Sequence, residues 1–328
     1  MRIIHAFQAR KLQGKFTKLP LSPHDLFTFL VQYARSDMNT STHTWRGMIY
    51  GFIGMACFSL TAPFTKLALE GFSPYFITVG RVSLAGVLAA IILYMRGEQW
   101  PKRIYWSRLL LVSLGVSIGF PLSLGIALTH TDASHAGIVL AILPLLTSIL
   151  GAWTHQEKHG KAFWLIAISG CLSVLAYIFW NNGIRLVPED IWLLVAALSA
   201  AVAYSTGADL TRTLGGMNTI CWVMVIMLPI SIPAIIYMVS QFGPFTAIPI
   251  SAFTAFLYLA LISQLLGFVP WYAGLSIGGV AAVSQVQLLQ TFLTLFASAL
   301  FLNEVIEWHL WLVAILVVGQ VYLAKKLS

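Results

Sequence analysis

Long apolar runs recur along the whole chain and alternate with short polar turns. They lie at residues 47–69, 75–95, 107–128, 134–154, 162–181, 190–211, 218–240, 252–273, 280–302 and 308–325. A helix of roughly 20 apolar residues crosses the hydrocarbon core of a bilayer, and each of these runs is about that long. The pattern therefore predicts an all-α polytopic membrane protein with ten transmembrane helices.

The pattern of the first half returns in the second half. Residues 127–157 align without gaps with residues 274–304 at an offset of 147, and residues 58–66 align with residues 204–212 at an offset of 146. Similarity at a nearly fixed offset indicates an internal repeat. We expect three parts, namely a basic tail at 1–46, a first five-helix repeat at 47–181 and a second five-helix repeat at 182–328.

The charge distribution predicts how the two repeats enter the membrane. Five helices per repeat is an odd number, so the second repeat would start from the opposite side and be inverted. If the N-terminus is cytoplasmic, sixteen of the 19 Lys and Arg residues fall on the cytoplasmic side, and only Lys66, Arg81 and Arg185 do not. Cytoplasmic loops are enriched in such cations. Both termini are therefore predicted to be cytoplasmic.

The composition leaves no room for a large soluble domain. Charged residues make up 9% and hydrophobic residues 59% of the chain, against about 25% and 45–50% in soluble domains. The 19 basic residues outnumber the 11 acidic ones, but they sit in the tail and the short loops. This favours membrane orientation over a nucleic-acid partner. Cys57, Cys171 and Cys221 lack metal-ligand spacing and are interpreted as small apolar fillers.

The basic tail carries no secretory signal, because its apolar run at residues 26–31 is short. An organelle presequence would also be basic and poor in acidic residues. A disordered cytoplasmic arm, or a translation start at Met38 in place of Met1, agrees better with the sequence. We therefore expect the tail to take no part in the fold.

Two clusters resemble metal-ligand spacing. They are His130, Asp132 and His135 (HTDASH), and His155, Glu157 and His159 (HQEKH). The predicted helix between them, at about 1.5 Å per residue, would hold them roughly 30 Å apart. They cannot build one site, and HQEKH is not the HExxH motif of zinc proteases. We expect no metal centre and no cofactor.

Three ionisable residues lie near the apolar interior, where a charge is costly unless it is paired or wet. Lys66 lies near the end of its helix and can extend to the interface. Asp209 can pair with Arg212 three residues along. Arg81 lies about two turns into its helix, and can be a structural anchor or a contact to substrate or gate. All three are candidate pathway residues.

The ninth predicted helix carries a polar stripe. Its members are Ser284, Gln287, Thr291, Thr294 and Ser298, with Gln290 at its flank. Spacings of three and four residues place them on one face, which should avoid lipid. Packing against other helices would suit the Ser and Thr side chains, whereas the glutamines favour a substrate path near the membrane midplane.

The eighth predicted helix adds further candidates to the path. Gln264, Gly267 and Trp271 fall along one of its faces. Gln264 offers hydrogen bonds, and the Trp271 ring could cover the apolar part of a solute. A role in helix packing is equally open for both residues.

The quoted features together resemble a known family. They are APFTKLALEGFSP at the end of the first helix, Arg81 early in the second, residues 127–157, and LLQTFLTLFASALFLNE in the second half. From residue 47 to 326 the chain looks like the EamA-type transporters of the drug/metabolite transporter superfamily. One departure is that Gln290 is followed by Thr291, where family members often have proline. Pro144 is kept in helix four, so the resemblance predicts a kink there in one half only.

The resemblance implies a secondary transporter that exports a small organic solute, such as an amino acid, a metabolite or a drug, by alternating access. Two alternatives remain, a membrane enzyme using His130, Asp132 and His135 at the outer surface, and a membrane scaffold without transport. No GxxxxGK[ST] motif occurs, so a gradient would drive transport. The expected location is the bacterial inner (plasma) membrane, with lipid and a small-molecule substrate as partners; a homodimer is compatible with the sequence.

Overall fold

The computed structural model describes residues 43–155, 159–182, 188–241, 248–302 and 309–327. They form one compact unit that begins at His43. Residues 1–42 of the tail lie outside the described part, so the expectations for them stay predictions. Within the described part the regular elements are helices, and no strand occurs, which confirms the all-α prediction.

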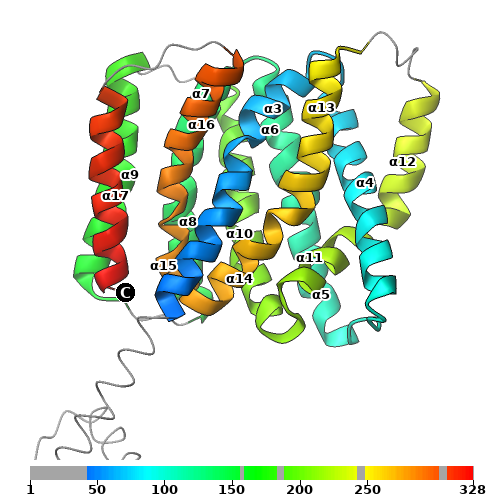
Figure 1. Ribbon diagram of the computed structural model, residues 1–328, viewed down its shortest axis with the longest axis horizontal. Coiled ribbons are helices and arrows are strands. Elements are labelled where there is room, and N and C mark those ends of the chain that lie inside the picture. Colours follow the sequence, from blue (N-terminus) through cyan, green and yellow to red (C-terminus); the bar gives the residue numbers. More distant parts are fainter. Residues whose placement is uncertain (1–42, 156–158, 183–187, 242–247, 303–308, 328) are drawn as a thin grey trace, which may run out of the picture. The chain divides into compact units, whose positions relative to one another are not determined.

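Helices follow one another along both halves of the chain (Figure 1). The first half contains the helical stretch His43–Ala68, which ends with α3 (Thr61–Ala68), then α4 (Pro74–Met95), η1 (Arg103–Tyr105), α5 (Trp106–Ser113), η2 (Leu114–Gly119), α6 (Phe120–Leu128), α7 (Ala133–Val139), η3 (Leu140–Ile142), α8 (Leu143–His155) and α9 (Lys161–Asn182). The second half contains α10 (Asp190–Leu214), α11 (Gly216–Val225), α12 (Leu228–Ser240), α13 (Ile250–Tyr258), η5 (Leu259–Leu266), α14 (Phe268–Gly278), α15 (Val280–Ser284), α16 (Gln287–Leu302) and α17 (His309–Leu327).

Several of these helical stretches can cross a membrane. Among the described residues seven are long and apolar enough, or eight if α11 and α12, bent by 53°, count as one broken span. The apolar parts found in α9 and α17, Lys161–Ser173 and Ile315–Ala324, are shorter. A multi-pass membrane protein is thus supported. The count of ten spans and the inverted orientation stay predictions.

The two halves pack into each other through equivalent pairs of helices. Within the described region α4 packs against α11 and α12, α8 against α15, α7 against α16, and α9 against α17. In addition, α3 packs against α13, and its repeat equivalent α10 packs against α5, the equivalent of α13. Figure 1 shows α17 beside α9 and α16 close to α7. Exchanging the halves therefore converts each of these helix pairs into itself or into another of them.

Hydroxyl and amide groups join the halves where α8 meets α15. The Ser148 and Ser284 hydroxyl oxygens lie 2.8 Å apart, and Gln285 Nε2 donates to Ser148 Oγ at 2.6 Å. All three side chains are buried. In a bundle that spans lipid, such bonds between small polar side chains hold helices together.

Regular α geometry is interrupted at equivalent places in the fourth and ninth predicted helices. Helix four contains the 3₁₀ turn η3, and helix nine is broken by a turn at Gln285 and Val286, between α15 and α16. The interruption in helix nine occurs without the proline that the family often has after Gln290. The predicted kink at Pro144 in one half only stays a prediction. Short 3₁₀ segments inside helices often mark hinges.

Two π-helical segments also occupy equivalent positions. In η2 the Phe120 amide donates to the carbonyl of Gly115, and in η5 the Gly267 amide donates to the carbonyl of Ile262 at 2.7 Å. Both bonds span five residues, and an offset of 147 converts the first pair into the second. Such π segments are rare and occur frequently at functional sites.

Gly207→Ala should destabilise the packing of α10 against α14. A Cβ atom at Gly207 would clash with Cε1 of Tyr272, whose ring is fully buried. Overpacking of this kind costs about 1–3 kcal/mol, so we expect a lower melting temperature in detergent. Gly319→Ala on α17 is the matched control, because a Cβ there meets nothing within 4 Å. Equal melting of the two variants would contradict the close approach.

Candidate functional site

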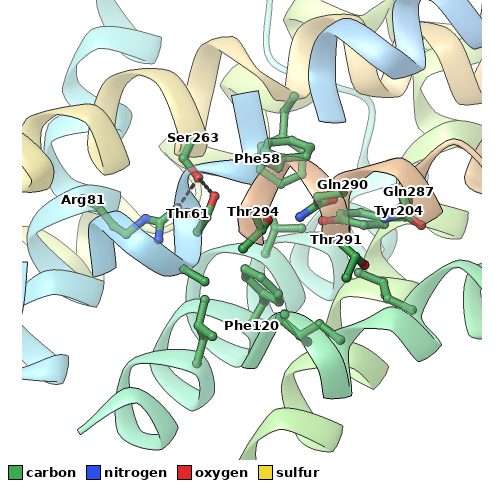
Figure 2. A pocket seen from close by; sticks show the side chains of 17 residues that line it. Phe58, Thr61, Arg81, Phe120, Tyr204, Ser263, Gln287, Gln290, Thr291 and Thr294 are labelled. Atoms are coloured by element: carbon green, nitrogen blue, oxygen red, sulfur yellow. Dashed lines mark hydrogen bonds between the residues drawn. The ribbon is translucent and has the colours of Figure 1, made fainter. Parts of the chain in front are cut away.

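A pocket lies between the two halves of the bundle (Figure 2). It is lined by Phe58, Thr61, Ala62, Arg81, Val116, Phe120, Leu124, Gly137, Leu140, Leu143, Tyr204, Ser263, Phe268, Gln287, Gln290, Thr291 and Thr294. The space between their atoms is about 710 Å³, part of it open to solvent, and the part open to the centres of water molecules is about 40 Å³. One water needs roughly 10–15 Å³ on the latter measure. The pocket is therefore narrow in this conformation and holds only a few waters.

The lining contains repeat equivalents from the two halves. Phe58 corresponds to Tyr204 at an offset of 146, and Val116 to Ser263, Leu140 to Gln287 and Leu143 to Gln290 at an offset of 147. In each pair the first-half residue is apolar and the second-half residue carries a polar group. The first half thus supplies mostly apolar wall, apart from Thr61 and Arg81.

At one end of the pocket Arg81 bonds to one hydroxyl group, which in turn contacts a second. Its Nη2 donates to Ser263 Oγ at 3.1 Å, and Ser263 Oγ lies 2.8 Å from Thr61 Oγ1 (Figure 2). These three residues come from α4, η5 and α3, so the cluster joins the two halves. Ser263 belongs to the π-helical segment η5, whose altered winding sets the direction of this hydroxyl.

The charge of Arg81 has no acidic partner within the described part of the chain. Its side chain is 2% exposed, its Nε has no hydrogen-bond partner, and no carboxylate of the described residues lies within ion-pairing distance. A buried cation is costly in an apolar environment unless it is paired or wet. The site therefore carries a positive charge that an incoming anion would neutralise.

Gln287, Gln290 and Thr291 line the opposite end of the pocket in Figure 2. Gln287 is 4% exposed, and neither its Oε1 nor its Nε2 has a partner. Gln290 is half-buried and Thr291 is buried. Leaving a buried amide unpaired costs about 1–3 kcal/mol, which is rare in native structures. These side chains are therefore available to a bound molecule.

Aromatic rings form the apolar wall of the pocket. Phe58 packs against Phe268 with ring centroids 4.7 Å apart, and Tyr204 lies 6.0 Å from Phe268. Trp271 lies behind this wall, where it is fully buried and contacts Phe58 and Tyr204 at 6.2 and 5.3 Å. It does not line the pocket in this conformation, and the ring surfaces that do belong to its neighbours and to Phe120.

Two further polar residues predicted for the path make contacts between helices. Ser284 bonds to Ser148, as described above, because the break before Gln287 separates it from the rest of the stripe. Gln264 Nε2 donates to the carbonyl of Val116 at 3.1 Å, while its Oε1 is buried without a partner. Neither side chain is among those that line the pocket. Thr294 does line it, and its hydroxyl donates to the carbonyl of Ser59 at 2.8 Å.

Lys66 and Asp209 also lie outside the pocket lining. Lys66 Nζ donates to the carbonyls of Leu128 and Thr131 at 3.0 and 2.7 Å, and so binds free carbonyls at the end of α6. Asp209 Oδ1 lies 3.6 Å from Nη1 of Arg212, three residues along the same helix. Both contacts satisfy the charges locally.

The histidine clusters are not brought together as metal sites. His130 and Asp132 are exposed, while His135 Nε2 lies 2.6 Å from Asp190 Oδ1 and links α7 to α10. Among the described residues no group of three His, Cys, Asp or Glu side chains is placed to hold a metal. In the second cluster Glu157 lies outside the described residues, and the His159 ring stacks on Phe163.

Sequence reasoning missed Phe58, Thr61, Tyr204 and Ser263 as pocket residues. A signal for one pair existed, because the alignment of residues 58–66 with 204–212 begins with Phe58 opposite Tyr204. No sequence pattern indicates that η5 is π-helical, and therefore none places Ser263 beside Arg81.

A multi-pass helical bundle with a central pocket shared by two repeats is the architecture of a membrane transporter. Comparison with known proteins agrees. The model of the EamA-like transporter family matches residues 45–179 and again 187–324. The chain is 36% identical over 291 residues to the uncharacterized transporter YdeK of Bacillus subtilis (strain 168), covering 89% of this chain and all of that protein. The chain belongs to the EamA-like transporter family.

A solved crystal structure supports the fold independently. It aligns with a TM-score of 0.67 over 86% of this chain and 99% of its own, at 19% sequence identity. At that identity the similarity concerns the fold alone.

Proposed function

We propose that the protein is a secondary exporter that moves a small organic solute by alternating access through the central pocket. The observation that carries the proposal is the shared lining, in which repeat equivalents from the two halves face one space. Several of the helix pairs that join the halves are also equivalent under exchange of the halves, among them α8 with α15 and α7 with α16. If the repeats are inverted, exchanging their conformations would close the pocket on one side and open it on the other.

The surroundings of the pocket suit binding without covalent chemistry. Its lining offers a guanidinium, two amides, hydroxyls and aromatic rings, which can hold a solute through hydrogen bonds and apolar contacts. The cation distribution favours both termini in the cytoplasm, and the membrane we propose is the bacterial plasma membrane. A gradient would supply the energy, since the sequence has no nucleotide-binding motif of the GxxxxGK[ST] kind.

Cysteine labelling tests topology and alternating access together. In a background with Cys57, Cys171 and Cys221 replaced by alanine, single cysteines are placed at Arg103, Asp132 and Gln290. A membrane-impermeant maleimide should label the Arg103 position only from the cytoplasm and the Asp132 position only from outside; both residues are exposed. A cysteine at Gln290 should react from each side, because the pocket opens to each in turn.

The control is a cysteine at Gln285, which is buried against Ser148 away from the pocket and should react from neither side. Labelling of the Asp132 position from the cytoplasm would contradict inversion, and reaction of the cysteine at Gln290 from a single side would contradict alternating access.

The direction of transport is tested with inside-out vesicles from cells selected in a toxicity-rescue screen. An exporter should load these vesicles, whereas a scaffold should leave them empty.

A further inference from the structure

The charge inventory of the pocket limits which solutes it can bind. Arg81 is the only Lys, Arg, Asp, Glu or His among the described residues that line it. A second anionic group on the solute would find no second cation. An ammonium group would find only neutral oxygens, and it would lie in the same narrow space as a guanidinium.

The free donors of Arg81 define the group that binds there. A guanidinium has five N–H donors in a plane, and one hydrogen bond, from Nη2 to Ser263, is found for Arg81. Nε is buried and unpartnered. Planar donors of this kind match the two oxygens of a carboxylate. Beside the guanidinium, the hydroxyls of Ser263 and Thr61 can each donate or accept a hydrogen bond, because either one can supply the proton of the bond between them.

The rest of the pocket defines the body of the solute. In Figure 2 Phe58, Phe120 and Thr294 lie between Arg81 and Gln287. The Thr294 hydroxyl donates to the carbonyl of Ser59, so the surface between the two polar ends is mostly apolar. At the far end the unpaired amide of Gln287 can both donate and accept. This order of groups fits an anionic head, an apolar middle and a neutral polar end.

We propose that the solute is a small organic monoanion, a monocarboxylate whose carboxylate binds Arg81 and whose apolar body lies against Phe58 and Phe120. This inference rests on the proposed function in one respect, that the solute passes through this pocket. The structure thereby narrows the broad range of small organic solutes to one charge class. Organic cations and dianions are poor ligands on this account.

Binding to the purified full-length protein tests the proposal without a membrane. The probes share one ring and differ in charge: phenylacetate, its neutral amide phenylacetamide, 2-phenylethylamine and the dianion phenylmalonate. Phenylacetate should raise the melting temperature saturably, and bind at least about tenfold more tightly than the amide, because hydrogen bonds between two charged groups are stronger than those to a neutral group. The amine and the dianion should give no saturable shift.

Variants of Arg81 show whether the preference arises at this site. In Arg81→Gln the preference of phenylacetate over phenylacetamide should disappear, and in Arg81→Lys it should persist with weaker affinity. Size-exclusion chromatography checks that each variant is folded. If Arg81→Gln is not folded, neither Gln287→Leu nor Arg81→Lys can replace it, because both keep the positive charge. Arg81→Met then serves as the second neutral variant.

Several outcomes would overturn the inference. These are equal binding of phenylacetate and phenylacetamide, binding of the amine, a preference that survives in the neutral Arg81 variants, or no shift with any monocarboxylate from acetate to indole-3-acetate. Stabilisation by chloride or phosphate as strong as by phenylacetate would assign the site to inorganic anions.

Exporter activity is measured separately, as flux in vesicles. Flux of a cation independent of Arg81 would overturn this inference alone, and charge-selective binding without flux would overturn the proposed function alone.

Discussion

Arg81→Met should raise the melting temperature of the protein in detergent while it reduces transport at least about tenfold. The guanidinium is buried with an unpaired Nε and no acidic partner among the described residues. Replacing even a buried ion pair by well-packed apolar side chains is often neutral or stabilising by about 1–4 kcal/mol. Removing a buried charge that has no acidic partner should be at least as favourable, and methionine adapts to irregular space. Transport should fall because charge-assisted bonds to an anionic solute, worth about 1.5–3 kcal/mol, are lost.

Two further variants make this result interpretable. Arg81→Lys keeps the charge without the planar donors, so transport should fall less and stability should not rise. Arg96→Met is the control, because the Arg96 side chain is 52% exposed and pairs with Glu98 at 3.8 Å. It should change stability by no more than about 0.5 kcal/mol and leave flux unaltered. If Arg81→Met melts earlier and transports normally, Arg81 is a structural anchor.

Gln287→Leu should reduce flux or change selectivity without destabilising the protein. Both polar atoms of the Gln287 amide are buried and unpaired, which costs about 1–3 kcal/mol in the empty protein. Leucine keeps the approximate size and removes that cost, so stability should stay equal or increase. The solute loses every hydrogen bond that the amide offers. Flux per folded molecule in proteoliposomes and melting in detergent measure the two effects.

Gln285→Leu is the matched control on the same segment. Gln285 is equally buried, but its Nε2 donates to Ser148 at 2.6 Å and its side chain does not line the pocket. Its loss should therefore lower stability, by about 0.5–1.5 kcal/mol for the bond, while the folded protein transports normally. If the two variants show the reverse pattern, the stripe is helix packing and the solute path lies elsewhere.

The positions of the helices could be read from the sequence because a bilayer demands long apolar runs. The predicted segment 75–95 corresponds to α4 (Pro74–Met95), and 190–211 to most of α10 (Asp190–Leu214). The sequence pattern did not predict where an apolar run bends. Residues 218–240 form α11 and α12, bent by 53°, with Pro229 in the first turn of α12. Hydropathy reports length and burial, not backbone direction.

The candidate site was predictable where periodicity held. Gln287, Gln290, Thr291 and Thr294 share a continuous α16 and all line the pocket. Ser284 lies beyond a break in the helix, so the assumption of 100° per residue no longer applies to it. The distinction between Gln287 and Gln285, one unpaired and one bonded, depends on partners in another helix and cannot be read from one sequence.

The π-helical segments η2 and η5 lie at the same place in the two halves. A π turn contains one more residue than the α turn it replaces, so it records a single-residue insertion in a helix. The two turns fall at the same place in each half, with Gly115 and Phe120 corresponding to Ile262 and Gly267. The two halves therefore share this backbone feature, while the pocket residues near it differ: the second half has Ser263, Gln287 and Gln290 where the first has Val116, Leu140 and Leu143.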